Sequence, residues 1–368
     1  MKNATTTEAE RAEFRSSLRD YLSKASPESR VRSVIDSGTG LDEAAWKGLA
    51  TDLGVAGLLI PEEFGGQGMG MAEMAVALEE SARALAVVPL LTSSVLSTLA
   101  IQLSGDQEAC AKYLPGLADG SEIFAFAGLD GALTTTVARN ETFWGLYGSK
   151  TAVLNASLAS RFLVVANTPD GTGLFVVEGD AGGIVIRPQD ALDLTRPTAL
   201  VTFEGTEGTR IGGDFTDALK SLQSFGRIAT SAELLGASER LMEVAVEYAK
   251  TREQFGKPII ENQGIAFMLA DMATSIEASR LLVWRAAWMA RQGKRFEKAE
   301  GSMSKLFAGE TAVKVTERAM QILGGNGFTR EYPVERWARD AKIYTIFEGT
   351  SEIQRLVIAR SISGAPIR

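Results

Sequence analysis

The sequence contains no histidine and only one cysteine, Cys110. Without an imidazole group the chain cannot form a Ser-His-Asp or Cys-His catalytic triad, and it cannot hold zinc through histidine. One thiol cannot form an internal disulfide or a cysteine-rich metal or iron–sulfur site, so no metal site is expected. Proton transfer in any reaction must therefore fall to Glu, Asp, Lys, Tyr or this single thiol.

The sequence also lacks excess positive charge and long apolar runs. The 38 Lys and Arg residues against 46 Asp and Glu residues give a net charge of −8, which argues against non-specific binding to nucleic acid. No apolar run approaches the roughly 20 residues of a membrane span, and the first residues lack the apolar core of a signal peptide. With the single cysteine, these absences predict a soluble cytoplasmic protein that binds neither nucleic acid nor membrane.

The length of 368 residues suggests two or three domains, and the hydrophobic pattern changes twice along the chain. Apolar residues recur at helical spacing in the first third and again in long stretches after residue 213. Between them lie short β-type runs separated by turn clusters, which favours a small antiparallel barrel or sandwich over a parallel sheet. The sequence therefore predicts an α+β protein with a helical domain at 1–119, a β-domain at 120–212 and a helical bundle at 213–368.

The same pattern gives expected bounds for the individual elements. The expected helices span residues 8–22, 41–53, 71–86, 90–103, 216–250, 262–292 and 296–323. The expected strands span residues 123–126, 143–147, 162–165, 174–177, 184–186 and 199–203. The last three helices have the length of rods in a helical bundle.

An acidic residue, Glu348, precedes a predicted helix near the C-terminus. Ser351 and Gln354 have the spacing of a capping box, so a helix is expected to begin at Ser351. Gly349 and Thr350 would form the turn before it, with Glu348 near the free backbone N–H groups and the positive dipole end of the helix. Taken alone, this segment is explained best by a glutamate that stabilises the turn.

Three segments resemble signatures of the acyl-CoA dehydrogenase family. The stretch Phe347–Ser351 is similar to the E-G-T-S turn that holds the family's catalytic base. Arg252–Pro258, followed by Gln263, resembles the R-x-x-F-G-K stretch with which one subunit reaches the FAD of its neighbour. Gln321–Phe328 resembles the family's Q-x-x-G-G-x-G-F flavin turn. The resemblance covers nearly the whole chain, and it implies the family's fold, with a C-terminal four-helix bundle.

This resemblance implies an FAD-dependent acyl-CoA dehydrogenase with Glu348 as its catalytic base. In such an enzyme the base removes the α-proton of an acyl-CoA substrate while the β-hydride passes to the flavin, which gives a trans-2-enoyl-CoA. The electrons then leave through an electron-transfer flavoprotein, and the subunits form a homo- or heterotetramer. Burial beside an apolar acyl chain is expected to raise the pKa of Glu348 toward neutrality.

The resemblance also implies which residues bind cofactor and substrate. A guanidinium at Arg252 suits the flavin pyrophosphate as a fixed bidentate donor, and adjacent glycines at 324 and 325 allow backbone N–H groups to approach a cofactor. Taken alone, a surface salt bridge and a helix C-cap explain these residues equally well. The residues expected to bind FAD are Arg252, Gln254, Phe255, Ile259, Asn262, Gln321, Gly324, Gly325, Thr350 and Glu352. The residues expected to contact the substrate are Arg227, Phe347 and Gly349.

The middle of the chain departs from the family pattern. Where family members carry T-E-P-x-A-G-S-D beside the flavin ring, residues 127–134 differ, and Ala152 and Leu154 replace the Trp and Thr of a K-x-W-I-T motif. Asn262 replaces a family histidine, and Phe347 replaces the common tyrosine before the base. Such losses resemble the heteromeric α2β2 branch of the family, some members of which act on steroid side-chain thioesters. The alternative hypothesis is therefore a non-catalytic subunit that clamps the FAD of a partner, its own base turn facing an empty half-site.

Some members of the family place the base near the start of the first helix of the bundle. That position corresponds to Gly226 here, beside Arg227, which resembles a family arginine close to the base. The nearest acids, Asp217 and Glu233, lie too far along a helix to substitute. If the chain carries its own chemistry, Glu348 must be the base.

Overall fold

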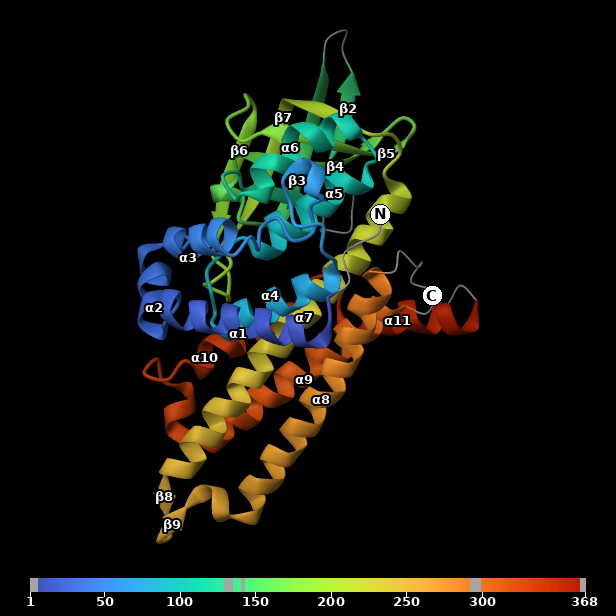
Figure 1. The fold of residues 1–368 in the computed structure, drawn as a ribbon. Helices are drawn as coiled ribbons and strands as arrows, with labels where there is room; N and C mark the ends of the chain where they lie inside the picture. Colours follow the sequence, from blue (N-terminus) through green and yellow to red (C-terminus); the bar gives the residue numbers. More distant parts are fainter. Residues whose placement is uncertain (1–5, 129–134, 140–142, 292–298, 365–368) are drawn as a thin grey trace. The chain divides into compact units, whose positions relative to one another are not determined.

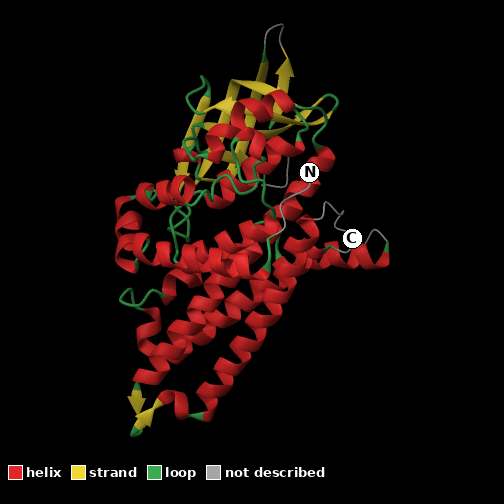
Figure 2. Cartoon of the chain, viewed as in Figure 1, coloured by secondary structure: helices red, strands yellow, loops and turns green. Residues whose placement is uncertain are grey.

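The computed structural model describes residues 6–128, 135–139, 143–291 and 299–364 (Figure 1; Figure 2). The chain forms two compact units, of which the first comprises Val31–Met74 and Val87–Gly226, and the second comprises Thr7–Arg30, Ala75–Ala86 and Arg227–Arg368. Helices occupy both ends of the sequence and strands its middle, which confirms the predicted order of helical, β and helical segments. The domain boundaries after residues 119 and 212 stay predictions.

Two helices in the first part of the sequence begin at acidic caps. Asp42 accepts a hydrogen bond from the amide of Ala45 at 3.3 Å, and Asp106 accepts one from the amide of Ala109 at 2.9 Å. The elements here, where η marks a 3-10 or π-helical segment, are α2 (Glu28–Ser37), α3 (Glu43–Lys47), η1 (Gly48–Asp52), η2 (Glu62–Phe64), α4 (Met71–Arg83), η3 (Leu90–Ser97), α5 (Thr98–Leu103) and α6 (Gln107–Ala118).

Two of the predicted helices contain π-helical segments. The helix expected over 41–53 consists of α3 followed by π-helical η1, and the one expected over 90–103 begins as π-helical η3 before α5. At η3, hydroxyl groups pair with the backbone of strand β1 (Phe124–Ala127). Ser93 Oγ accepts from the amide of Phe124 at 3.2 Å, and Ser97 Oγ donates to the carbonyl of Phe124 at 3.2 Å. These bonds cover the free edge of β1. The helical spacing of apolar residues in the sequence does not predict such contacts.

Seven strands form one sheet in the first unit. They are β1, β2 (Thr136–Arg139), β3 (Trp144–Leu154), β4 (Arg161–Thr168), β5 (Gly171–Glu178), β6 (Ile184–Gln189) and β7 (Thr198–Ile211). Neighbours follow the order β1-β4-β2-β3-β7-β5, with β6 on β7, and β5 also pairs with β4, so five strands close on themselves as a barrel. The ladders are antiparallel, as predicted, except that β4 runs parallel to β1 and meets β2 in a parallel bridge.

The barrel interior is filled by apolar side chains from β4, β5 and β7. Phe162, Phe175 and Phe203 are each at most 1 % exposed and belong to one core cluster. Strands β4 and β5 are buried along nearly their whole length, and such continuous apolar runs are readable in a sequence. The four-residue strand β2 carries no such run and was not predicted.

The second unit is helical, apart from one small hairpin. It contains α1 (Glu8–Ala25), the part of α7 (Thr216–Thr251) from Arg227 on, β8 (Glu253–Gln254), β9 (Lys257–Pro258), η5 (Ile259–Glu261), α8 (Gln263–Arg291), α9 (Glu300–Leu323), η6 (Gly324–Phe328), α10 (Val334–Tyr344) and α11 (Ser351–Ser363). Helices α8 and α9 pack along each other, and the β8–β9 hairpin joins the ends of α7 and α8 (Figure 1). The three long helices match their expected bounds closely, although the expected start at Phe296 lies outside the described residues.

No helix in the described ranges is long and apolar enough to cross a membrane.

Candidate active site

The segment between α10 and α11 forms a tight turn around Glu348. Helix α10 ends at Tyr344, and the amide of Phe347 still bonds to the carbonyl of Ile343 at 3.0 Å. Glu348 and Gly349 then both adopt left-handed conformations, with φ of +56° and +92°. Glycine adopts this conformation readily, whereas a glutamate is strained in it and must be held by its surroundings.

Helix α11 begins at Ser351, as predicted, but the predicted capping box is wrong. Thr350 is the N-cap residue, and its hydroxyl accepts a hydrogen bond from an amide of the first turn at 3.4 Å. Gln354 is fully buried, and its Nε2 donates to the carbonyl oxygens of Glu348 and Gly349 at 2.9 and 3.1 Å. The Gln354 side chain serves the turn rather than the helix start, because two left-handed residues leave these carbonyls without a helical partner.

The carboxyl group of Glu348 is buried and incompletely bonded. The residue is 8 % exposed, and its Oε1 accepts no hydrogen bond from the described residues. Burial raises the pKa of Glu348 to about 7, although the charges of Arg227 and Lys305 act in the opposite direction. A carboxyl group that titrates near neutrality is well matched to general base catalysis.

Two cations accompany Glu348. Arg227 is half-buried on α7, and its Nη1 lies 3.5 Å from Ser302 Oγ on α9. Lys305 is buried on α9, and its Nζ donates to the carbonyl of Gly349. Burial lowers the pKa of Arg227 and lowers the pKa of Lys305 to about 8, while the charge of Glu348 acts to raise both. The turn thus combines one buried acid with two nearby cations.

The two acids nearest to the alternative base position are engaged elsewhere. Asp217 is exposed and pairs with Lys220 at 2.7 Å. Glu233 is buried and accepts a hydrogen bond from the hydroxyl of Tyr344. The Tyr344 ring meets the ring of Phe347 edge-on, with centroids 6.3 Å apart. Both acids thus have partners within the chain.

Comparison with known proteins identifies the family. Residues 8–121 match the model of the acyl-CoA dehydrogenase N-terminal domain, and residues 215–363 match that of the C-terminal domain. The chain belongs to the acyl-CoA dehydrogenase family. Enzymes of this family are oxidoreductases that act on a CH–CH bond and use FAD.

Individual relatives agree with the chain over most of its length. It is 40 % identical over 333 residues to an acyl-CoA dehydrogenase of Bacillus subtilis (strain 168), a match that covers 84 % of this chain and 87 % of the relative. It is 35 % identical over 368 residues to the mitochondrial short-chain specific acyl-CoA dehydrogenase of Sus scrofa, covering 94 % and 88 %. The structure of butyryl-CoA dehydrogenase from Megasphaera elsdenii matches with a TM-score of 0.89 at 30 % identity, covering 98 % and 99 %.

Three of the residues predicted to bind FAD lie on the exposed β8–β9 hairpin. Arg252, Gln254 and Phe255 are all exposed, and Phe255 is 95 % exposed in a left-handed conformation. The guanidinium of Arg252 forms no ion pair or hydrogen bond within the described ranges. An unpaired guanidinium on an exposed hairpin fits a pyrophosphate ligand, because it offers free bidentate donors.

A second part of the predicted FAD set lies at the end of α9. Gln321, Gly324 and Gly325 are exposed, and a Cβ atom at either glycine would meet nothing within 4 Å, which leaves room for a cofactor. Gln321 follows Lys305 by 321 − 305 = 16 residues, about 24 Å along the helix axis. One chain therefore does not bring these residues together with Glu348.

The remaining predicted cofactor residues divide between the hairpin and the turn at Glu348 and Gly349, which we call the base turn. Ile259 and Asn262 are half-buried between the hairpin and α8, where Asn262 Nδ2 donates to the carbonyl of Ile259 at 3.2 Å. Thr350 and Glu352 lie at the start of α11, beside the base turn. Of the predicted substrate residues, Phe347 and Gly349 lie at that turn, and Arg227 on α7 acts on Glu348 through its charge.

The departures in the middle of the chain coincide with an irregular backbone. Residues 129–134 lie outside the described residues. Ala152 has a left-handed φ of +51°, at a point where the register of β3 and β7 shifts, and its amide donates to Gln189 Oε1 at 2.9 Å. Leu154 is buried at 8 % exposure and offers no side-chain hydrogen bond. The positions of the family's Trp and Thr are thus occupied by a strained small residue and a core residue.

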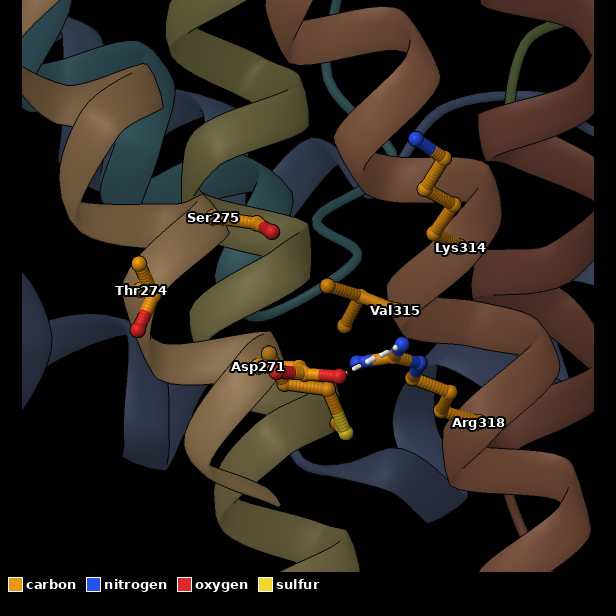
Figure 3. Close-up of a pocket in the computed structure, with 7 residues that line it drawn as sticks. Asp271, Thr274, Ser275, Lys314, Val315 and Arg318 are labelled. Carbon is orange, nitrogen blue, oxygen red and sulfur yellow. Dashed lines mark ion pairs between the residues drawn. The ribbon is translucent and has the colours of Figure 1, made fainter. Parts of the chain in front are cut away.

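A surface pocket between α8 and α9 contains paired charges (Figure 3). It is lined by Asp271, Met272, Thr274, Ser275, Lys314, Val315 and Arg318. An ion pair of 2.8 Å between Asp271 and Arg318 crosses it. Asp271 is exposed and is paired with an arginine, so the pocket offers no buried, unpaired acid comparable to Glu348.

Lys305 was not predicted from the sequence, and Gln354 was predicted only as part of a cap. One available signal is the position of Lys305 on α9, where Ala308 and Ala312 follow at helical spacing on the buried face. A lysine on a buried stripe is uncommon and indicates a specific partner for its charge.

Proposed function

We propose that this chain removes the α-proton of an acyl-CoA thioester with Glu348 and yields a trans-2-enoyl-CoA. The observation that carries the proposal is the buried Oε1 atom of Glu348, which has no hydrogen-bond partner among the described residues. Buried polar atoms are almost always bonded, and an exception calls for an explanation such as a catalytic role. The pKa of about 7 also supports the proposal, because a large fraction of the Glu348 carboxyl groups is then ionised at neutral pH.

The turn also offers a donor for the substrate. The α-proton of a thioester is barely acidic in water, so negative charge that develops on the carbonyl oxygen must be stabilised. The amide of Glu348 donates no hydrogen bond to any described residue, which leaves it free to bind that oxygen. Arg227, half-buried beside the base, adds positive charge to the same region.

The cofactor residues fit FAD and divide into two groups. Arg252, with Gln254, Phe255, Ile259, Asn262, Gln321, Gly324 and Gly325, would hold FAD at the hairpin end of the helices, whereas Thr350 and Glu352 would hold it at the base turn. When bound, FAD accepts the two electrons that leave the substrate, and an electron-transfer flavoprotein would reoxidise it. The hairpin group supports a flavin clamp that acts on a neighbouring subunit, because it lies far from the base of its own chain.

This division supports the proposed assembly of subunits into a tetramer. The exposed hairpin needs a neighbour, because Phe255 on the hairpin is 95 % exposed, and Phe328 at the end of η6 is 76 % exposed. Relatives named for short-chain acyl-CoA and butyryl-CoA support a short acyl group as the substrate. The cytoplasmic location and the two domain boundaries remain predictions.

The experiment that tests the base is the substitution Glu348→Gln. The amide has nearly the same shape but cannot accept the proton, so flavin content should be retained while acyl-CoA-dependent loss of flavin absorbance slows by at least about 100-fold. Glu317→Gln, at an exposed acid of α9, is the matched control and should react at the wild-type rate. A normal rate in Glu348→Gln would assign the base to another residue or another subunit.

The alternative is a non-catalytic, FAD-clamping subunit of a heterotetramer of the steroid-type branch. Ala152 and Leu154 favour it, because neither covers a flavin ring nor donates a hydrogen bond to one. The visible spectrum of the purified chain discriminates between the two. A stable yellow protein supports the first proposal, and a colourless chain that becomes yellow only with a related partner supports the alternative.

A further inference from the structure

Two buried side chains from different helices hold the carbonyl groups of the base turn. Gln354 on α11 donates to the carbonyl oxygens of Glu348 and Gly349 at 2.9 and 3.1 Å. Lys305 on α9 donates through Nζ to the same Gly349 oxygen. Both side chains are at most 1 % exposed, so water does not compete for these carbonyls.

The Gly349 carbonyl alone does not explain a buried lysine. Burial of an ammonium group is unfavourable unless hydrogen bonds and an opposite charge compensate for it. Within the described ranges, Gly349 O is the one hydrogen-bond acceptor of Lys305, and Glu348 is the acid that acts on it most strongly. The base turn, rather than the packing of α9, therefore compensates for the burial of the ammonium group.

We propose that Lys305 is the positioning residue of the base. It anchors the left-handed Glu348–Gly349 turn to α9 and keeps a positive charge beside the carboxyl group. The inference rests on the proposed role of Glu348, and it concerns a residue that acts through Glu348 rather than on the substrate.

The charged groups around the carboxyl come from three helices. Arg227 on α7 and Lys305 on α9 are the cations that act on Glu348, and the exposed Glu352 on α11 acts on Lys305. Loss of the Lys305 charge would leave Arg227 as the remaining cation. The ionised form of Glu348 would then be less favoured, so its titration should move to higher pH.

Three variants separate the hydrogen bond from the charge. Lys305→Met keeps the side-chain length and removes both. Lys305→Gln removes the charge and keeps a donor for the Gly349 carbonyl. Lys314→Met, at an exposed lysine of the same helix, is the matched control.

The first measurement is hydrogen–deuterium exchange of the amides from 344 to 356 in the flavin-bound protein without substrate. Relative to Lys314→Met, exchange should be at least about tenfold faster in Lys305→Met, because the turn has lost its anchor to α9. Lys305→Gln should fall between the two. Wild-type exchange in Lys305→Met would overturn the anchoring role. This measurement needs no turnover, so it stands even if the wild type does not oxidise acyl-CoA and the proposed function fails.

The second measurement is the pH profile of acyl-CoA-dependent flavin reduction. In Lys305→Met and Lys305→Gln the midpoint of kcat should rise by about one pH unit, and kcat at pH 7 should fall by up to about tenfold, with KM nearly unchanged. Lys314→Met should keep the wild-type midpoint. If Lys305→Met does not fold, the pH profile of Lys305→Gln alone tests the proposal. An unchanged midpoint in a folded Lys305 variant would overturn the proposal, since a merely structural lysine predicts lower flavin content or stability instead.

Discussion

The base turn and the β8–β9 hairpin belong to the same helical unit but have opposite physical character. Glu348 is 8 % exposed, and its turn is held by the buried side chains of Gln354 and Lys305. Arg252 on the hairpin is exposed and pairs with none of the described residues, and Phe255 beside it is 95 % exposed. The base turn is held in place by side chains of its own chain, whereas the hairpin presents hydrogen-bond donors and an apolar surface that the chain does not use.

This difference shows which part of the proposed chemistry the chain provides by itself. A strained residue such as Glu348 persists only where its surroundings fix it, and the turn has these surroundings in its own helices. An exposed guanidinium is held in no fixed geometry until a ligand or a partner orders it. Under the proposed function, the chain would supply its own base and would complete its flavin clamp only in an assembly.

The largest expected effect on the hairpin is at Arg252. Loss of a charge-assisted contact to the pyrophosphate costs about 1.5–3 kcal/mol, so Arg252→Ala should weaken FAD binding by roughly 10- to 100-fold. Titration of the stripped protein with FAD, followed by flavin fluorescence, measures this. Lys257→Ala, on the neighbouring strand of the hairpin, is the control and should bind FAD almost normally. Equal flavin affinity in the two variants would mean that Arg252 does not bind FAD, which would contradict the proposed difference between the hairpin and the base turn.

A smaller effect concerns the pH dependence of stability. The pKa of Glu348 in the folded state is about 7, above the value of 4.5 for a free glutamate, so the folded state binds more protons between these values. Its contribution to stability is fully present below about pH 4.5 and is lost as pH rises through about 7. Burial also raises the pKa of Glu79 to about 7, so Glu79 changes the stability in the same direction. The effect of Glu348 is therefore isolated by comparing wild type with a variant that lacks the Glu348 carboxyl group.

That comparison uses urea unfolding of wild type and Glu348→Gln between pH 4.5 and pH 7.5. Wild type should lose about 1–3 kcal/mol more of its unfolding free energy over this range than Glu348→Gln does, because the amide has no charge to bury. Glu253→Gln, at an exposed acid of the hairpin, should change with pH as wild type does. Parallel curves for all three proteins would mean that Glu348 is solvated in solution.

The sequence predicts the architecture better than it predicts the site. Long amphipathic stretches and buried apolar strands are local signals, so the helix expected over 216–250 and the strand expected over 162–165 lie where α7 and β4 are found. Glu348 was predicted as the base through the family resemblance, and this role stays a prediction. The parallel pairing of β1 with β4 and the π-helical turn at η3 depend on partners distant in sequence, which periodicity does not register.

The supporting contacts of the base were missed for the same reason. Gln354 matches a local capping pattern, but its bonds go to the turn carbonyls because the backbone there is left-handed. Lys305 lies 43 residues before Glu348 (348 − 305) and is brought to it only by the packing of α9 against the turn. No local pattern of residues encodes such a contact.

The most direct test of the account combines two defective variants in one assembly. Glu348→Gln keeps an intact hairpin, and Arg252→Ala keeps an intact base. The two are coexpressed with different tags, purified through both tags, and assayed for acyl-CoA-dependent flavin reduction at an FAD concentration that saturates wild type but not Arg252→Ala. If each base works with the hairpin of its neighbour, about half of the sites in a two-fold assembly are intact, and activity should return to about half of the wild-type value. Activity no higher than that of the separate variants would contradict the account, because base and clamp would then have to act within one chain.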